Sequence, residues 1–465
     1  MYYASVGDMI RESAHAVQID GEVRVTDPTA FRHDVIDRLV YTAVFGSGET
    51  QEAARWLIWE AAWDLGVRSA SIDDLYQARA RGEFEGLSVP AINVRGMSYD
   101  TARAATRAAV RRNVGAYIFE LARSEMGYTF QRPAEFVSVI TAAAIKEGHQ
   151  GPLFIQGDHY QANAKKYVKS PDAEIQGLRD LITEAIAAGY QNIDIDTSTL
   201  VDLSYPTVME QQRHNYERCA ELAALIRELE PEGVTISIGG EIGEVGKHNS
   251  TVEELRAFLD GFNQVFRRLA GDARGLSKVS VQTGSSHGGV VLPDGSIAQV
   301  KIDFETLRSL SAVAREYGLG GAVQHGASTL PAALFDRFPE AGCLEIHLAT
   351  EFQNISFDGG AFPGDLKEEI YAFLRKEMAD EKVDSETDQQ FIYKTRKKAW
   401  GPFKQQVWDI SPQVRGEIGG HLEAKFEFLY SQLGVIDSRA IVERYVTPVR
   451  VTRPAPASLQ AASPR

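Results

Sequence analysis

Cysteine is almost absent from this sequence. The chain has 465 residues and two cysteines, Cys219 and Cys343, which lie far apart in apolar surroundings. Neither belongs to a CxxC motif, so we expect no disulfide framework. Proteins without disulfide bonds are typical of reducing compartments, and we therefore expect a cytoplasmic protein.

Long apolar runs and an excess of positive charge are also lacking. No stretch of 18 apolar residues occurs, so we expect no membrane span. The first residues, MYYASVGDMIRESAH, lack the basic start and apolar core of a signal peptide. The 49 Lys and Arg residues against 64 Asp and Glu residues give a net charge of −15. Such a chain is a poor candidate for binding nucleic acid, although a local basic pocket could hold a phosphorylated metabolite.

What the chain does contain, from about residue 87, is a rhythm of short apolar runs typical of strands, with helical patterns between them. Eight such runs occur, at 89–94, 116–121, 152–156, 192–196, 234–241, 278–283, 320–325 and 343–348. Strands that alternate with helices pair in parallel. Eight units over about 250 residues predict a closed (β/α)8 barrel, a TIM barrel of the α/β class.

The remaining chain is divided by its composition. Residues 1–86 have helical patterns and are predicted to form an N-terminal helical extension. Residues 87–445 are predicted to hold the barrel and further C-terminal helices, and the Pro/Ala/Ser-rich residues 446–465 a disordered tail. Trp56, Trp59 and Trp63 have helical spacing, which favours a packing stripe, one that could cover an interface between subunits.

Polar residues stand at the ends of the predicted strands, where barrels of this kind carry their active sites. In strand order they are Asn93, Glu120, Asp158 with His159, Asp196, Glu241, His287, His325, and His347 with Thr350. Each histidine alone is most simply a loop residue. Three of them, His159, His287 and His325, directly follow predicted strands and converge with carboxylates, which favours a catalytic metal site of the zinc type. The carboxylates could complete the ligand set or orient the imidazoles.

Several motifs resemble those of the class II, metal-dependent fructose-bisphosphate and tagatose-bisphosphate aldolases. They are SIDDLYQARARGEFEGLSVPAINV, GDHYQANAKK, IDTS, GEIGEVG, SSHGGV and QHGAS, in that order. The resemblance covers residues 75–355, with a fainter similarity at 391–434. It implies cleavage or condensation of a phosphorylated ketose to dihydroxyacetone phosphate and an aldehyde through a metal-stabilised enediolate.

The resemblance also implies roles for single residues. His159, His287 and His325 would hold a divalent metal, usually zinc, with manganese or cobalt as alternatives, and a monovalent cation could bind as well. Asp196 and Glu241 match acidic positions near the metal, and Asp158 matches the acid/base at the breaking bond. The groups around the phosphorylated substrate would be Asn93, Gly288, Gly326, Ser328, His347 and Thr350. The family is commonly dimeric or larger, so a homo-oligomer is expected.

The departures from the family fall on the phosphate and dihydroxyacetone end. The loop EVGKHNST carries Lys247, His248 and Asn249 where the family has acidic residues, so Glu244 or His248 would have to act as the base. His347 and Ala349 stand where asparagine and aspartate are expected. The metal is thus better supported than the usual substrate. Two alternatives stay open: another metal-dependent lyase or isomerase on a sugar phosphate, and a non-catalytic aldolase-like subunit.

Two further motifs are weak. GEVGKHNS is not a P-loop, because Glu241 occupies the position of the first glycine and His248 replaces the Ser or Thr that binds magnesium. The segment YKTRKKAW (393–400) is basic and aromatic, and is predicted to be a solvated helix face. The alternative is that Arg396 or a nearby lysine reaches the distal phosphate of the substrate.

Overall fold

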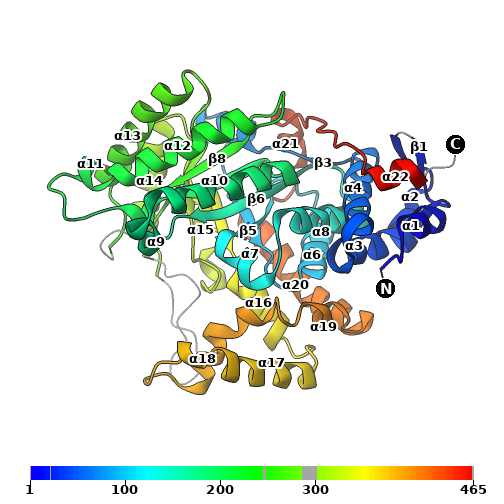
Figure 1. Ribbon diagram of the computed structural model, residues 1–465. Coiled ribbons are helices and arrows are strands. Elements are labelled where there is room, and N and C mark those ends of the chain that lie inside the picture. The colour runs from blue at the N-terminus through cyan, green and yellow to red at the C-terminus, as the bar shows by residue number, and fades with distance from the viewer. Residues whose placement is uncertain (1, 21, 244–247, 285–300, 463–465) are drawn as a thin grey trace.

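Eight parallel strands form a closed barrel at the centre of the computed structural model, which describes residues 2–20, 22–243, 248–284 and 301–462. The strands are β4 (Val89–Asn93), β5 (Ile118–Ala122), β6 (Gly151–Gln161), β7 (Asn192–Asp196), β8 (Ser237–Glu241), β9 (Lys278–Val281), β10 (Ala322–Gln324) and β11 (Glu345–Leu348). β11 pairs with β4 and closes the ring. The predicted barrel is therefore confirmed, and each strand lies within or across its predicted run (Figure 1).

Helices surround the barrel. The longer ones are α6 (Ser98–Arg111), α8 (Pro133–Lys146), α10 (Pro171–Ala188), α12 (Arg213–Leu229), α13 (Val252–Ala270) and α14 (Phe304–Glu316). α13 shows why they form. Thr251 and Glu254 make a reciprocal capping box at its start. The apolar residues Leu255, Phe258 and Phe262 follow at helical spacing and are buried.

The N-terminal part contains more than the helices that the sequence predicted. Its helical elements are α1 (Val6–Ser13), α2 (Pro28–Ala30), η1 (Phe31–Val35), α3 (Ile36–Phe45), α4 (Gly48–Asp64) and α5 (Asp73–Ala80). A hairpin of β1 (Val17–Asp20) and β2 (Glu22–Val25) interrupts them. β3 (Val67–Ser69) pairs in parallel with the start of β6. These runs of three or four residues were too short to show a period of two.

Helices also follow the barrel, as predicted. They begin with α16 (Thr350–Asp358) and α17 (Gly364–Glu377), and continue with α18 (Asp388–Thr395), η5 (Arg396–Ala399), α19 (Lys404–Trp408), α20 (Pro412–Gln432) and α21 (Arg439–Tyr445). Figure 1 shows α17 and α18 in a lobe below the barrel. α20 returns from this lobe and packs on α6 of the barrel wall.

Residues 446–459 pack against α4, where the sequence predicted disorder. Trp56 and Trp59 donate their indole N–H groups to the carbonyls of Arg453 and Val451, at 3.1 and 2.9 Å. The Arg453 guanidinium lies 3.6 Å from the centre of the Trp59 ring. Two of the three tryptophans are thus packed against the chain's own C-terminal segment, which ends in α22 (Ala457–Ala462). The backbone carbonyls of this proline-containing segment thus accept hydrogen bonds from the indoles of α4, which explains why the segment is ordered.

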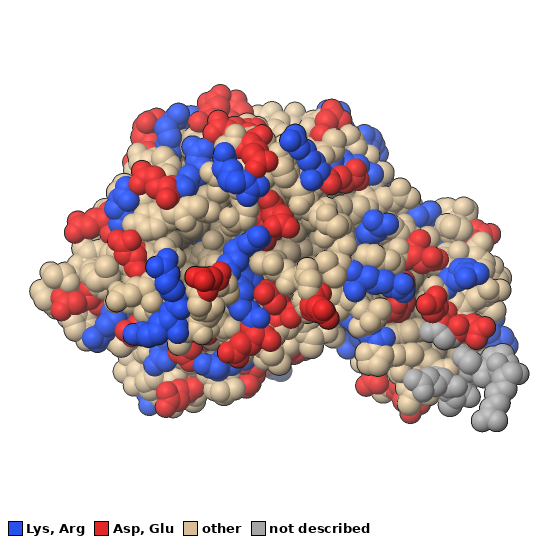
Figure 2. Space-filling model, turned by 90° about the horizontal axis from the view of Figure 1, so that it is seen from above, with Lys and Arg blue, Asp and Glu red and all other residues tan. Residues whose placement is uncertain are grey.

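Two expectations from composition are met in the described part of the chain. Cys219 and Cys343 are buried and unpaired. Among the described residues, no helix combines the length and the apolar character needed to cross a bilayer. Acidic and basic side chains are interspersed over the face shown in Figure 2.

Candidate metal and acid–base site

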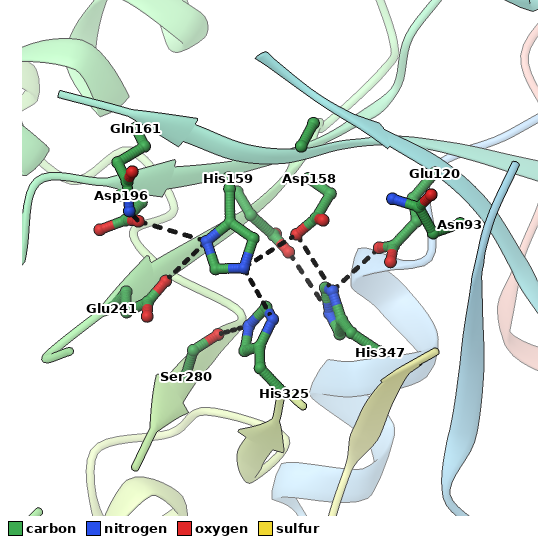
Figure 3. A network of polar contacts seen from close by, with 12 residues as sticks. Asn93, Glu120, Asp158, His159, Gln161, Asp196, Glu241, Ser280, His325 and His347 are labelled. Atoms are coloured by element: carbon green, nitrogen blue, oxygen red, sulfur yellow. Dashed lines mark hydrogen bonds and ion pairs between the residues drawn. The ribbon is translucent and has the colours of Figure 1, made fainter. Parts of the chain in front are cut away.

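Asp158 and His159 lie on an irregularity inside β6, and not just beyond the end of a strand as we had expected. The pairing of β6 with β7 shifts register between Gly157 and Tyr160. His159 has a φ of 41°, which is unusual for a residue other than glycine. A bulge breaks the alternation of side chains between the two faces of a strand. Both side chains can therefore enter the barrel mouth, as Figure 3 shows.

His159 is at the centre of the first polar cluster. Its Nδ1 lies 3.2 Å from Asp196 Oδ2 and 3.2 Å from Glu241 Oε2. Its Nε2 lies 2.9 Å from Nδ1 of His325. The other ring nitrogen of His325 lies 2.9 Å from the hydroxyl of Ser280. Four strands, β6, β7, β8 and β9, together with the residue that follows β10, thus bring this cluster together (Figure 3).

The cluster fits a divalent metal ion. His159, Glu241 and His325 can each offer one ligand atom, and these atoms lie within 4.8 Å of one another. Two imidazoles and a carboxylate are a zinc-type donor set. Burial, and then Asp196, raise the pKa of Glu241 to about 7. Burial would lower the pKa of His159, but the carboxylates of Asp158 and Glu241 raise it well above its ordinary value. The cluster therefore attracts positive charge. The proposed ligand His287 lies outside the described residues.

Asp158 is held between this cluster and a fourth histidine. Its Oδ1 lies 3.6 Å from His159 Nε2 and 3.1 Å from His347 Nδ1. The same nitrogen of His347 lies 2.9 Å from Glu120 Oε2. Burial, and then Asp158, raise the pKa of Glu120 to about 8. His347 was predicted to contact the substrate, but the structure places it in the barrel interior with both ring nitrogens in polar contacts.

A second polar layer lies directly below. We call Asp158, His159, Asp196, Glu241 and His325 the upper layer, and Gln156, Asp194, Lys278 and Glu345 the lower layer. Lys278 Nζ lies 2.5 Å from Glu345 Oε1, 3.0 Å from Asp194 Oδ1 and 2.6 Å from Gln156 Oε1. His347 Nε2, 2.6 Å from Glu345 Oε1, joins the two layers. Burial would raise the pKa of Glu345, but Lys278 and His347 lower it below its ordinary value.

The lower layer needs space that one glycine provides. A Cβ at Gly239 would lie 2.3 Å from Asp194 Oδ1 and 3.0 Å from Lys278 Cε. Any larger residue at this point of β8 would therefore displace the ion pair. Tyr76, from α5 of the N-terminal extension, donates its hydroxyl hydrogen to Glu345. The N-terminal extension thus contributes to the interior of the barrel.

The predicted substrate-binding residues lie around the rim. Ser328 Oγ accepts a hydrogen bond of 2.7 Å from the amide of Ala349. Thr350 Oγ1 accepts one of 3.3 Å from Arg95 Nη2. Asn93 donates its side-chain amide to Glu125 Oε2 at 2.5 Å. Gly326, directly after His325, has a φ of 71°. Gly288 lies outside the described residues.

His248 is apart from the cluster. It is exposed, its Nδ1 lies 2.7 Å from the carbonyl of Asn249, and its Nε2 lies 3.9 Å from Glu254 Oε1. In the structure it therefore contacts the start of α13, and not the upper layer. Glu244 and Lys247 of the same loop lie outside the described residues.

Several site residues were missed by the sequence reasoning. They are Arg95, Glu125, Gln156, Asp194, Lys278, Ser280 and Glu345. A signal for the lower layer was present in the sequence. Gln156, Asp194 and Glu345 each stand two positions before a residue that had been singled out: Asp158, Asp196 and His347. In a strand, residues two apart face the same side.

Comparisons with known proteins identify the family of the chain. The family model of class II fructose-bisphosphate aldolase matches residues 74–401. No curated protein matches the chain.

Solved structures are similar in fold at low sequence identity. A probable tagatose 6-phosphate kinase from Sinorhizobium meliloti 1021 is 18% identical with a TM-score of 0.52, over 81% of this chain and 97% of that one. A fructose-bisphosphate aldolase from Campylobacter jejuni is 17% identical with a TM-score of 0.47, over 80% and 96%. The family model spans all eight barrel strands and well over half of the sequence, and the chain therefore belongs to the class II fructose-bisphosphate aldolase family.

Proposed function

We propose that this protein is a metal-dependent aldolase, which cleaves and forms a carbon–carbon bond of a phosphorylated ketose. The observation that carries the proposal is the position of Asp158. Its carboxylate lies 3.6 Å from Nε2 of His159, and His159 forms with Glu241 and His325 a donor set of two imidazoles and a carboxylate at the C-terminal mouth of the barrel. A carboxylate next to a metal-binding cluster is the arrangement that proton transfer at a metal-held oxygen needs.

The metal would be held by His159, Glu241 and His325, with His287 proposed as a further ligand and zinc as the first candidate. When bound, a divalent ion polarises the carbonyl and hydroxyl oxygens of a ketose as a Lewis acid. Manganese and cobalt are the alternatives to zinc, and a monovalent cation could bind in addition; elemental analysis of the purified protein would identify the metal. Asp196 orients His159, because its carboxylate contacts His159 Nδ1 and is itself held by Ser198 and Gln161 at 2.7 and 2.5 Å.

In cleavage, Asp158 would take the proton from the hydroxyl on the carbon whose bond to the next carbon breaks. In condensation it would return this proton. The residue is 5% exposed, so little water competes for this proton. His347 Nδ1 contacts the same carboxylate oxygen, Oδ1, that lies beside His159, and helps to fix its position. A second base would be needed for the proton at the dihydroxyacetone carbon. Glu241 or a residue of the 244–248 loop would fill this role.

The phosphate of the substrate would lie at the β10–β11 rim, near Gly326, Ser328 and Thr350, with Gly288 close by. Ser328 already accepts a backbone hydrogen bond there, and its hydroxyl hydrogen can be donated to a phosphate oxygen. Asn93 would contact the sugar from the end of β4, the strand that pairs with β11.

Another metal-dependent lyase or isomerase acting on a sugar phosphate is the second candidate. It is favoured by His347, which contacts Asp158 where the family has asparagine, and by the distance of His248 from the cluster. A non-catalytic subunit is the weakest candidate. A scaffold would not require buried carboxylates and imidazoles at ligand distance, since burying them costs free energy.

A coupled assay for dihydroxyacetone phosphate release tests these candidates. Fructose 1,6-bisphosphate, tagatose 1,6-bisphosphate and simpler ketose 1-phosphates are offered with and without a chelator. We expect release from one of them that the chelator abolishes and added zinc restores. Bound metal with no release from any sugar would overturn the aldolase proposal and favour the second candidate. Metal analysis and light scattering on the same sample test the proposed zinc and the proposed homo-oligomer, and fractionation of cells tests the proposed cytoplasmic location.

A further inference from the structure

Tyr76 belongs to the N-terminal extension, yet its phenol group reaches the polar interior of the barrel. It lies in α5, which precedes the first barrel strand, and its side chain is completely buried. Its hydroxyl donates a hydrogen bond to Oε2 of Glu345, on the last barrel strand, β11. Burial, and then Glu345, raise the pKa of Tyr76 well above its ordinary value, so the phenol keeps its hydrogen and acts as a donor.

The helix that carries this phenol is tied to the barrel beside the strand that carries its partner. Arg79, one turn after Tyr76 in α5, is buried. It donates hydrogen bonds of 3.1 Å to the carbonyls of Gly342 and Cys343, just before β11. It also donates one of 2.5 Å to the carbonyl of Leu87, just before β4. The phenol and its acceptor are therefore held by backbone segments that are fixed to each other.

The two oxygens of the Glu345 carboxylate have different partners. Oε1 accepts hydrogen bonds from three side chains, which are Lys278 at 2.5 Å, His347 at 2.6 Å and Gln156 at 2.9 Å. Within the part of the chain that the structure describes, the hydrogen bond from Tyr76 is the only one to Oε2. The last torsion of a glutamate is soft, and a donor on each oxygen restricts it. Tyr76 therefore helps to aim Oε1 at the imidazole of His347.

His347 passes this alignment on to the proposed acid/base. Because an ionised carboxylate only accepts hydrogen bonds, the hydrogen on His347 Nε2 is directed at Glu345, and this contact sets the orientation of the ring. Nδ1, on the other side of the ring, then lies 3.1 Å from Asp158 Oδ1 (Figure 3).

We propose that Tyr76 is a positioning residue for the acid/base Asp158, and that it acts through the two side chains between them. The N-terminal extension would then take part in the reaction, although its helix lies outside the ring of strands. The inference rests on the proposed function, because it assumes that Asp158 transfers a proton of the substrate.

Removal of the phenol oxygen alone tests this role. The variant is Tyr76→Phe. The matched control is Tyr430→Phe, because Tyr430 is equally buried and its hydroxyl donates to the carbonyl of Ala105 at 3.1 Å, between α20 and α6. Each variant loses one buried hydrogen bond, so we expect similar falls in melting temperature. Only Tyr76→Phe should lower kcat, about three- to tenfold, with KM nearly unchanged. Equal kcat values in the two variants, or a change confined to KM, would overturn the proposal.

A double variant tests the route of the effect. If Tyr76 acts through His347, then Tyr76→Phe should lower kcat no further in a protein that already carries His347→Asn. Losses of kcat that multiply would show that the two residues act independently, and would overturn the proposed route.

A signal that needs no turnover separates this inference from the aldolase proposal. In the full-length protein labelled with ¹⁵N-histidine, the Nε2–H resonance of His347 is identified by its absence in His347→Asn. We expect it to shift in Tyr76→Phe and to stay in place in Tyr430→Phe. A resonance that Tyr76→Phe leaves unmoved would overturn the positioning. If the resonance moves but no sugar releases dihydroxyacetone phosphate, the alignment of His347 by Tyr76 stands and the aldolase proposal fails. Release with a kcat that is insensitive to Tyr76→Phe would give the reverse result.

Discussion

The upper and the lower polar layers of the barrel contain similar side chains, yet they differ in the source of their positive charge. Among the residues that the structure describes, three sets of His, Asp and Glu residues lie at ligand distance, including His159–Glu241–His325 above and Asp194–Glu345–His347 below. In the lower layer Lys278 Nζ already lies between Asp194 and Glu345. In the upper layer, Asp196 and Glu241 pair with His159, and Asp158 pairs with His159 and His347. The comparison teaches that a set of close ligands already occupied by a buried ammonium is an ion pair, which makes the upper layer the better candidate for a metal.

The largest effect should come from the upper layer. Replacing Asp158 by Asn removes the proposed proton acceptor with little change in shape, so kcat should fall about 10²- to 10⁴-fold. Metal content and melting temperature should stay as in the wild-type protein, because Asp158 is not among the proposed ligands. Steady-state kinetics with metal analysis on the same sample measure both. A variant with full kcat would show that Asp158 has no part in proton transfer.

The lower layer should respond in stability instead. Lys278→Met leaves two buried carboxylates without their cation, and removing one partner of a buried ion pair costs about 3–5 kcal/mol. Lys278 and Glu345 are 1% and 0% exposed, so water cannot take the place of the ammonium. Urea unfolding measures the loss, with the surface variant Lys398→Met as a control. A loss below about 1 kcal/mol would mean that the lower layer does not depend on Lys278.

Metal removal should make the stability contributed by the upper layer depend on pH. Glu241 has a folded pKa of about 7 against an ordinary 4.5, so the folded metal-free protein binds a proton that the unfolded chain has released. Its contribution to stability is complete below about pH 4.5 and is lost as pH rises through 7. A difference of about 2.5 in pKa corresponds to about 3 kcal/mol. The raised pKa values of His159 and Glu120 act in the same direction, and so does that of Asp194 in the lower layer, which burial raises to about 6. Glu345 and Asp196 have lowered pKa values, which matter only in acid.

Because a bound metal needs deprotonated ligands, it should restore this loss. The gain in melting temperature on metal binding should therefore be greater at pH 8 than at pH 5.5. Thermal unfolding with and without chelator at the two pH values provides the measurement. A gain that is equal at both, or greater at pH 5.5, would contradict metal binding through Glu241.

Much of this could be predicted from the sequence, for physical reasons that differ between regions. The eight strands were predictable because each is an apolar run bounded by a helical pattern, and their closure into a barrel made the strand ends meet. His159, His325, Asp196 and Glu241 were therefore expected in one place, and they are. The bulge in β6 was not predictable, because a bulge is defined by the pairing of β6 with β7, which the sequence of β6 alone does not show.

Other features were hidden for a different reason. Lys278 and Glu345 interrupt apolar strands and look unfavourable until the fold brings their charges together. Arg396 is one of three adjacent basic residues predicted to form a solvated face, and its burial beside Asp358 becomes visible only in the folded chain. The order of residues 446–459 depends on indole donors about 400 positions earlier in the chain.

His347 provides the finest test, because it connects the two layers. Its Nδ1 contacts Asp158 and its Nε2 contacts Glu345, which pairs with Lys278. The ring therefore connects the proposed acid/base to the buried ion pair of the lower layer. His347→Asn should lower kcat about tenfold, leave KM nearly unchanged and cost about 1–2 kcal/mol of stability, the value of a lost buried hydrogen bond. His347→Gln, whose longer amide can reach both partners, should recover part of kcat. If both variants lose stability but keep the wild-type kcat, His347 serves the lower layer alone and the two layers are independent.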